Sequence, residues 1–342
     1  MTGLSAQALA FARKKGCPND GWVQLPADAS PRRYFRQPCS PFGPCLLMVT
    51  DPDAPDLRAY LQIAAHLDGL GLSAPQIYAA EISSGLALIE DFGDNTYTSL
   101  LRAGVDERGL YETGIDALIQ LHNHPKGGQI DLPAFDMPAL MQEVQLFPDW
   151  FAPSVAPGRD LTGFAQAFGA LWRDALGDVA QRRDTLVLRD YHVDNLMLLT
   201  DRTDAARCGL LDFQDGLIGS AAYDVLSLTQ DARRDVPQAL EQVVLARYFA
   251  ARPQLDTKRF MQDFHLLAAQ RHTKVAGIFH RLSQREGKPH YLTHMPRVLR
   301  LLDQALDHAG LLEIRALMDR HLSGWNGAAA ATTPFRQDAK NV

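Results

Sequence analysis

Three polar side chains in the segment 186–215 have the types and spacing that phosphoryl transfer requires. Asp190 and Asn195 stand five residues apart in one short loop, and Asp212 ends a later apolar run. Because a single loop carries Asp190 and Asn195, both can point into the same cavity. Phosphoryl transfer needs a carboxylate that orients or deprotonates the attacking hydroxyl, and oxygen ligands for the Mg²⁺ that bridges nucleotide phosphates. Asp190 suits the first role, and Asn195 and Asp212 suit the second.

The elements that must position these side chains are short apolar runs. Leu186–Arg189, Leu196–Leu199 and Cys208–Asp212 each have the length and composition of a buried strand. The polar segment Thr200–Arg207 joins the second and third runs, which indicates a hairpin. Polar residues follow each run, so the loops at the strand ends are where we expect the chemistry.

Residues 20–90 have the pattern of a small sheet crossed by one helix. Apolar residues from Leu57 to Leu70 follow helical spacing, and Gly69 and Gly71 supply the stop. A short amphipathic helix is expected over Leu4–Lys14. The predicted strands are Trp22–Leu25, Cys45–Thr50, Gln76–Ala80 and Leu86–Glu90.

After Asp91 the pattern becomes helical. The predicted helices are Leu110–His122, Phe164–Val179, 236–251, 258–285, 296–309 and 311–322. The chain therefore combines a small β-rich lobe with a larger helical lobe that contains the hairpin.

The loop and hairpin resemble the kinase pattern H-R-D-x-x-x-x-N followed by D-F-G, in the form used by the aminoglycoside phosphotransferase family. Leu118–His122, Ala222–Asp224 and Glu90–Phe92 match further motifs of that family in the expected order. The resemblance implies an α+β, protein-kinase-like, two-lobed fold. It implies a nucleotide-binding lobe over 1–91 and a catalytic and acceptor-binding lobe over 92–325, and we expect a disordered tail over 326–342.

Longer motifs are similar to one group within that family, the anomeric sugar kinases of bacterial cell-wall recycling. These motifs are Ser30–Arg36, Leu146–Phe151, Leu211–Asp215, Gln270–Phe279 and Gly287–Leu292. The similarity implies an ATP- and Mg²⁺-dependent kinase that phosphorylates the 1-hydroxyl of N-acetylmuramic acid, N-acetylglucosamine or both. It assigns catalysis to Asp190 and the metal to Asn195 and Asp212.

The nucleotide lobe departs from the family pattern. Ser30–Phe35 contains no glycine, and the strand Leu46–Thr50 lacks the lysine that holds the α- and β-phosphates. Arg32 or Arg33 could supply the missing charge, although a solvent-exposed arginine pair on a turn is an equal alternative. The predicted ATP-binding residues are Ser30, Arg32, Arg33, Glu90 and Asp91.

The acceptor site is expected from motifs of the helical lobe and from the residue after the hairpin. The predicted substrate-binding residues are Asp149, Trp150, Asp215, Arg271 and Lys274. Four of these residues have a structural alternative: a core position for Trp150, support of a neighbouring functional residue for Asp215, and a solvated face or an ion pair for Arg271 and Lys274. Asp194, beside Asn195, is expected to be an exposed turn residue.

Composition excludes several classes of protein. The formal net charge is −6 and the arginine pairs are isolated, which argues against a nucleic-acid-binding protein. No apolar run approaches the roughly 20 residues that span a bilayer. Four cysteines without C-x-x-C spacing favour free thiols. We expect a cytoplasmic monomer that acts on a small amino sugar.

Other functions stay open on the sequence. The same scaffold could serve another acceptor, such as an aminoglycoside, choline or homoserine. The missing lysine and glycines would also fit a nucleotide-binding pseudokinase, although the predicted base and both metal ligands are present. A scaffold protein that binds no nucleotide is a further alternative.

Overall fold

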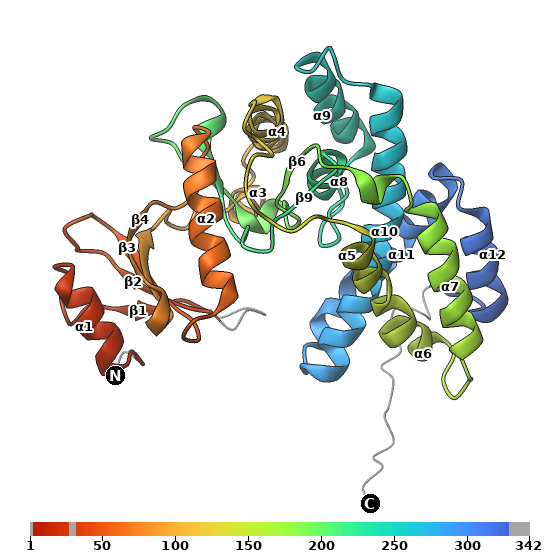
Figure 1. Ribbon diagram of the computed structural model, residues 1–342, viewed down its shortest axis with the longest axis horizontal. Helices are drawn as coiled ribbons and strands as arrows, with labels where there is room; N and C mark the ends of the chain where they lie inside the picture. Colours follow the sequence, from red (N-terminus) through yellow and green to blue (C-terminus); the bar gives the residue numbers. More distant parts are fainter. Residues whose placement is uncertain (1–2, 27–31, 328–342) are drawn as a thin grey trace, which may run out of the picture. The chain divides into compact units, whose positions relative to one another are not determined.

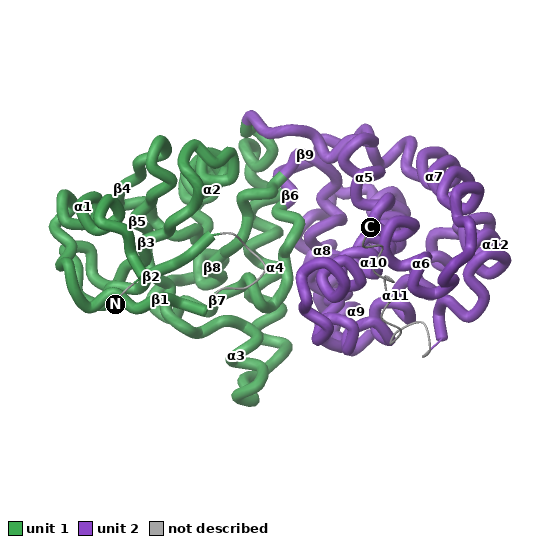
Figure 2. The backbone as a smooth tube through the Cα atoms, turned by 90° about the horizontal axis from the view of Figure 1, so that it is seen from below, with its two compact units in different colours: residues 1–130, 188–216 green, residues 131–187, 217–342 purple. Residues whose placement is uncertain are grey.

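The computed structural model describes residues 3–26 and 32–327. The chain divides into two compact units, residues 1–130 with 188–216 and residues 131–187 with 217–342 (Figure 2). The boundary expected at residue 91 is a division by function, between a nucleotide-binding lobe and a catalytic lobe. It remains a prediction. Ser30 and residues 328–342 of the expected disordered tail lie outside the described residues.

A five-stranded antiparallel sheet in the order β1-β2-β3-β5-β4 forms the N-terminal part of the first unit (Figure 1). Its strands are β1 (Val23–Gln24), β2 (Arg33–Gln37), β3 (Cys45–Val49), β4 (Ile77–Glu81) and β5 (Leu86–Glu90). Helices α1 (Ala6–Lys14) and α2 (Pro55–Gly69) accompany it. The Ser5 side chain caps α1, and Pro55 begins α2, where its missing N–H costs no helical hydrogen bond.

The two faces of this sheet have different partners. Phe35 and Leu47 are register partners on β2 and β3, and they pack with Phe11 of α1 in one apolar cluster. Successive strand residues point to opposite faces, so Tyr34 and its partner Met48 lie on the other face. Figure 1 shows α2 on the side away from α1.

The remainder of the first unit contains the predicted hairpin. Strands β7 (Leu196–Leu198) and β8 (Cys208–Leu210) pair antiparallel. Helices α3 (Tyr97–Arg102) and α4 (Glu107–Asn123) precede it in sequence, capped by the side chains of Thr96 and Asp106. Short 3-10 turns cover Ile82–Ser84, Val193–Asn195 and Asp204–Arg207.

The second unit is mainly helical. Its helices are α5 (Met137–Val144), α6 (Ala152–Val155), α7 (Thr162–Ala175), α8 (Ala222–Thr229), α9 (Gln238–Ala250), α10 (Thr257–Arg285), α11 (Met295–His308) and α12 (Leu312–His321). Strands β6 (Thr185–Val187) and β9 (Leu217–Gly219) form a two-stranded ribbon. A π-helical turn covers Phe147–Phe151, and 3-10 turns cover Val179–Gln181 and Pro289–His294. No helix within residues 3–26 and 32–327 is long and apolar enough to cross a membrane.

Helix α10 is the centre of the second unit. It packs against α5, α8, α11 and the turn Phe147–Phe151, and most of its residues from Phe260 to Leu282 are buried. Gly277 permits one of these approaches, because a Cβ there would stand 2.3 Å from the Leu146 carbonyl oxygen. Any larger residue at this position would push α10 away from the turn.

Most of the predicted helices and strands are present, with ends that differ by a few residues. The sequence pattern does not predict β2, β9, α3, α5, α6 or α8. On β2, Arg33 and Arg36 lie on opposite faces, so the strand shows no polar–apolar alternation. On α8 every residue is buried, so no amphipathic stripe marks the helix.

Candidate active site

Backbone hydrogen bonds hold the loop before β7 in a compact shape. The amides of Asp190, His192 and Asn195 donate to the carbonyl oxygens of Leu188, Asp190 and His192 at 2.9, 3.1 and 2.9 Å. The side-chain amide of Asn195 also donates to the Asp190 carbonyl oxygen at 3.0 Å. The two predicted functional residues of this loop are therefore fixed to each other.

The same loop is anchored to helices of the first unit. The Tyr191 hydroxyl donates to the Gly114 carbonyl oxygen of α4 at 2.7 Å. Asp194 accepts a hydrogen bond from the Thr98 hydroxyl of α3, and its other oxygen lies 3.9 Å from Nδ1 of His192. Asp194 is therefore not simply an exposed turn residue, because it ties the loop to α3.

Strained backbone brackets the site. The φ angles of Arg189 and Asp212 are 70° and 57°, in the left-handed region that side chains other than glycine rarely adopt. Each such residue costs about 1–3 kcal/mol, and strain of this kind clusters at functional sites. Arg189 donates to the Asp215 carbonyl oxygen at 3.2 Å, and the Leu211 amide donates to the Asn195 carbonyl oxygen at 3.0 Å. These bonds hold the strained segments beside each other.

Asp212 has two polar neighbours. Nη2 of Arg32 lies 2.7 Å from Oδ1 of Asp212, and Nε2 of Gln214 donates to the same oxygen at 3.1 Å. Gln214 also donates to Asp215 Oδ2 at 3.2 Å, so it bridges the two carboxylates. Gln214 had no predicted role, and its position between two acidic residues was the available signal. The Asp212 side chain remains 43% exposed, which leaves it open to a ligand.

The donor set fits a magnesium ion that also takes ligands from nucleotide phosphates. Since the Asn195 nitrogen donates to the Asp190 carbonyl, its amide oxygen is the atom that could take a metal. Asp212 supplies one carboxylate, and Mg²⁺ prefers oxygen ligands and few protein carboxylates. Within the described part of the chain, no three or more His, Cys, Asp or Glu residues form a self-sufficient metal cluster.

The segment after β5, predicted to contact ATP, is held by two arginines. Arg36 of β2 lies 2.6 Å from one oxygen of Asp91 and 2.9 Å from Asp94, and it donates to the Gly93 carbonyl oxygen at 3.1 Å. Arg202 of the hairpin turn forms an ion pair with Glu90. The Glu90 and Asp91 side chains are thus engaged in shaping the segment, and their contact with ATP remains a prediction.

In the second unit, two predicted substrate-binding cations lie on α10 among buried partners. Nζ of Lys274 is 2.7 Å from Oε1 of Glu143, and Nε2 of Gln270 donates to Oε2 of the same carboxylate at 2.9 Å. Arg271 donates to the Tyr223 hydroxyl at 3.2 Å, with its guanidinium 5.3 Å from the ring centre. The ion-pair alternative for Lys274 is present, while both substrate roles remain predictions.

Asp149 and Trp150 lie on the π-helical turn that Gly277 allows close to α10. Asp149 is exposed and accepts from the Gln145 side chain at 2.8 Å. Trp150 is half-buried, whereas Phe151, the next residue of this turn, is fully buried. The turn therefore leaves part of an aromatic side chain and a carboxylate outside the core, and their contact with a substrate remains a prediction.

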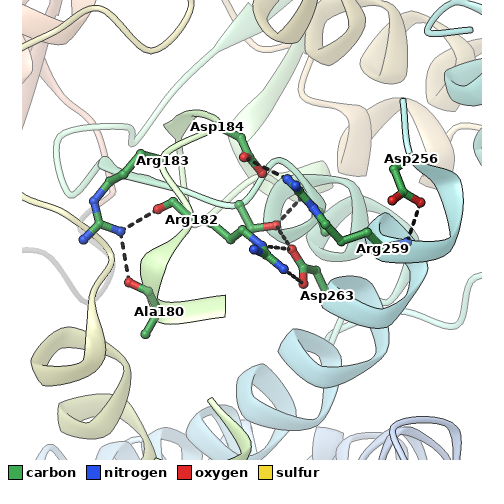
Figure 3. A network of polar contacts seen from close by, with 9 residues as sticks. Ala180, Arg182, Arg183, Asp184, Asp256, Arg259 and Asp263 are labelled. Atoms are coloured by element: carbon green, nitrogen blue, oxygen red, sulfur yellow. Dashed lines mark hydrogen bonds and ion pairs between the residues drawn. The ribbon is translucent and has the colours of Figure 1, made fainter. Parts of the chain in front are cut away.

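A second polar network supports the β6–β9 ribbon of this unit (Figure 3). Nε of Arg182 is 2.9 Å from Oδ2 of Asp263, which also accepts from the Ser220 hydroxyl at 3.2 Å. Arg259 of α10 reaches Asp184 at 3.4 Å. These contacts join the segment before β6 and the residue after β9 to α10. They also explain why Asp263 of α10 can be buried, because its carboxylate has polar partners.

Comparison with known proteins identifies the family of this chain. A model of the phosphotransferase enzyme family matches residues 21–258. The chain is 37% identical over 274 residues to the N-acetylmuramate/N-acetylglucosamine kinase of Caulobacter vibrioides, which covers 77% of this chain and 74% of the relative. It is 36% identical to the protein of the same name from Pseudomonas aeruginosa, over 84% of this chain and 86% of the relative.

A solved structure has a fold similar to that of this chain. The ADP-bound aminoglycoside phosphotransferase APH(2'')-Ib has a TM-score of 0.58 at 14% identity, over 90% of this chain and 99% of its own. The predicted α+β, protein-kinase-like fold is confirmed, as is the predicted phosphotransferase class of enzyme. The chain belongs to the phosphotransferase enzyme family.

Proposed function

We propose that this chain is an ATP- and Mg²⁺-dependent sugar kinase that phosphorylates the anomeric 1-hydroxyl of N-acetylmuramic acid, N-acetylglucosamine or both, in peptidoglycan recycling. The observation that carries the chemistry is the fixed loop and hairpin that hold Asp190, Asn195 and Asp212 in the first unit. The acceptor rests on the relatives named N-acetylmuramate/N-acetylglucosamine kinase. A cytoplasmic location and a monomeric state are part of the same proposal.

In this proposal Asp190 orients the sugar hydroxyl and takes its proton as the sugar oxygen bonds to the γ-phosphorus of ATP. The bond from that phosphorus to the departing ADP oxygen breaks in the same transfer. The Asn195 amide oxygen and the Asp212 carboxylate would hold the metal, which when bound would supply positive charge against the nucleotide phosphates. Because the loop is tied to α3 and α4, Asp190 needs little reorganisation before reaction. Positioning and charge neutralisation then supply most of the rate increase.

The acceptor would be bound by Asp149, Trp150, Asp215, Arg271 and Lys274. An indole face suits the apolar side of a sugar ring, and a guanidinium suits a carboxylate such as that of N-acetylmuramic acid. Glu90, Asp91, Ser30 and one of the two arginines Arg32 and Arg33 would bind ATP.

The experiment is an ADP-release assay with ATP, Mg²⁺ and a panel of acceptors: N-acetylmuramic acid, N-acetylglucosamine, glucosamine, kanamycin, choline and homoserine. Phosphorus NMR identifies the product. We expect sugar 1-phosphates from the two N-acetyl sugars alone. Turnover only on another acceptor would keep the chemistry and overturn the substrate, and nucleotide binding without any turnover would favour a pseudokinase.

A further inference from the structure

Strand β3 offers no cation to nucleotide phosphates. Its residues Leu46 and Met48 share a face with Arg36 and Tyr34 of β2, because register partners in an antiparallel pair point to the same side. Both are apolar, so a phosphate-binding charge on this face has to come from a segment other than β3.

Strand geometry separates the two candidate arginines. Arg33 lies on the α1 face, since its guanidinium is 6.0 Å from the ring centre of Phe35, which packs with α1. Arg32 lies just before β2, and its hydrogen bond to Asp212 and its electrostatic interaction with Tyr34 put it on the opposite face, with Tyr34 and Arg36. Arg33 is exposed, whereas Arg32 is only 7% exposed.

Arg32 lies in the middle of a group of functional and aromatic side chains. Its guanidinium is 2.7 Å from Asp212, 180 residues later in the chain. Tyr60 of α2 stacks on Phe213, the residue that follows Asp212, at 4.9 Å between ring centres. Burial lowers the pKa of Arg32, but Tyr34 and Asp212 together raise it above its ordinary value, so the charge persists.

We propose that Arg32 is the phosphate-binding cation of this chain, and that it exchanges its contact with Asp212 for the nucleotide phosphates when the nucleotide binds. This rests on the proposed function only as far as nucleotide binding. Asp212 balances the buried guanidinium beforehand, and the carboxylate remains accessible enough to take a metal afterwards. Arginine suits the exchange because its planar fork bonds carboxylate and phosphate oxygens in the same geometry.

Arg36 lies on the same face and cannot replace Arg32 in this role. Its guanidinium is already shared between Asp91 and Asp94 and the Gly93 carbonyl oxygen. Moving it would release the segment that follows β5.

The test compares binding of ADP with binding of adenosine, which carries no phosphate, by titration calorimetry on the full chain with Mg²⁺. Arg32→Ala would remove the proposed hydrogen bonds between the guanidinium and the charged phosphates. ADP binding should therefore weaken by about 10- to 100-fold. Adenosine binding should stay within about twofold of wild type, since the loss falls on the phosphate contact. Arg32→Lys should recover part of the ADP affinity, because a point charge replaces the fork.

Arg33→Ala is the matched variant on the opposite face, and we expect it to keep the wild-type ratio of the two affinities. Arg32→Gln keeps an N–H donor for Asp212 without the charge, so it decides the question if the alanine variant does not fold. Wild-type ratios in the Arg32 variants, or an equal loss in Arg33→Ala, would overturn the proposal. No sugar is present, so a wrong acceptor in the proposed function would leave this ratio unchanged.

Discussion

The hairpin β7–β8 with its flanking loops, residues 188–216, and helix α10 both collect charged side chains, yet they hold them in opposite ways. In the hairpin region the backbone is strained at Arg189 and Asp212, and the Asp212 side chain is 43% exposed. On α10 the backbone is regular, and Lys274 and its partner Glu143 are only 8% and 7% exposed.

The difference separates a charge that is open to a ligand from charges that are buried against each other within the fold. A half-exposed carboxylate on strained backbone keeps coordination sites open at a cost in stability. In a buried pair each charge offsets the other. A substitution that removes one partner leaves the other as an uncompensated buried charge, which is very unfavourable. Substitutions in the two regions should therefore act on different properties.

The largest expected effect is on turnover, from Asp190→Asn. The side chain keeps its shape but cannot accept the proton, so kcat should fall by about 10²- to 10⁴-fold. ADP affinity and the melting temperature should change little, because the loop is held by backbone hydrogen bonds. Steady-state kinetics on the N-acetyl sugars checks this.

Asp204→Asn is its matched control in the same hairpin. Asp204 is exposed and has φ 51°, a conformation that asparagine adopts readily, so turnover should match wild type. An Asp190→Asn enzyme with near wild-type kcat would remove the assigned base.

Next in size is the stability effect of Lys274→Met. Leaving Glu143 buried without its cation should lower the free energy of unfolding by about 3–5 kcal/mol. Urea unfolding without ligand measures it, so a sugar-binding role of Lys274 does not enter. Lys288→Met, which breaks the more exposed pair with Glu286, should cost less than about 1 kcal/mol. Equal losses in the two variants would contradict the contrast.

The local parts of both regions could be predicted from sequence, and the contacts between distant segments could not. The hairpin followed from two apolar runs and a polar turn, and its motif residues from their order. The contact of Arg32 with Asp212 joins residues 180 apart, and that of Gln270 with Glu143 joins residues 127 apart. No local spacing encodes such pairs.

Helix α10 shows why burial is the hardest property to predict. The five residues Gln270–Lys274 are all polar or charged, which is typical of a solvated helix face. All five are buried, because α5, α8 and α11 surround the helix and partners such as Glu143 and Tyr223 satisfy the cations. For Lys274 the sequence allows a substrate contact, a solvated face or an ion pair, and the ion pair follows only from the position of Glu143.

A smaller effect is expected from the buried histidines of α10. Burial, with a contribution from Arg271, lowers the pKa of His272 to about 3, and burial lowers the pKa of His280 to about 4. The unfolded chain takes up these protons near pH 6.5 while the folded chain does not, so stability is complete above pH 6.5 and is lost as the pH falls towards 4.

His272→Gln should therefore reduce the difference in unfolding free energy between pH 7 and pH 5 by about 2 kcal/mol. Urea unfolding at the two pH values measures this. His290→Gln, at an exposed position, is the control and should leave the difference near its wild-type size. An unchanged pH dependence in His272→Gln would show that His272 takes up a proton in the folded chain.

The smallest effect on stability is expected at an exposed group of ion pairs in the second unit. A hydrogen bond from Arg297, opposed by partial burial and aided by Arg300, lowers the pKa of Asp235 to about 2. The interaction of Asp235 with these two arginines stabilises the fold at pH values above about 4, the ordinary pKa of an aspartate in the unfolded chain. This stability is lost as the pH falls towards 2. Because the Asp235 side chain is 62% exposed, solvent screening should hold the loss in Asp235→Asn at pH 7 below about 1 kcal/mol. Raising the salt to about 1 M should shrink that loss further. A loss as large as that of Lys274→Met, insensitive to salt, would show that burial is not what separates the two kinds of ion pair.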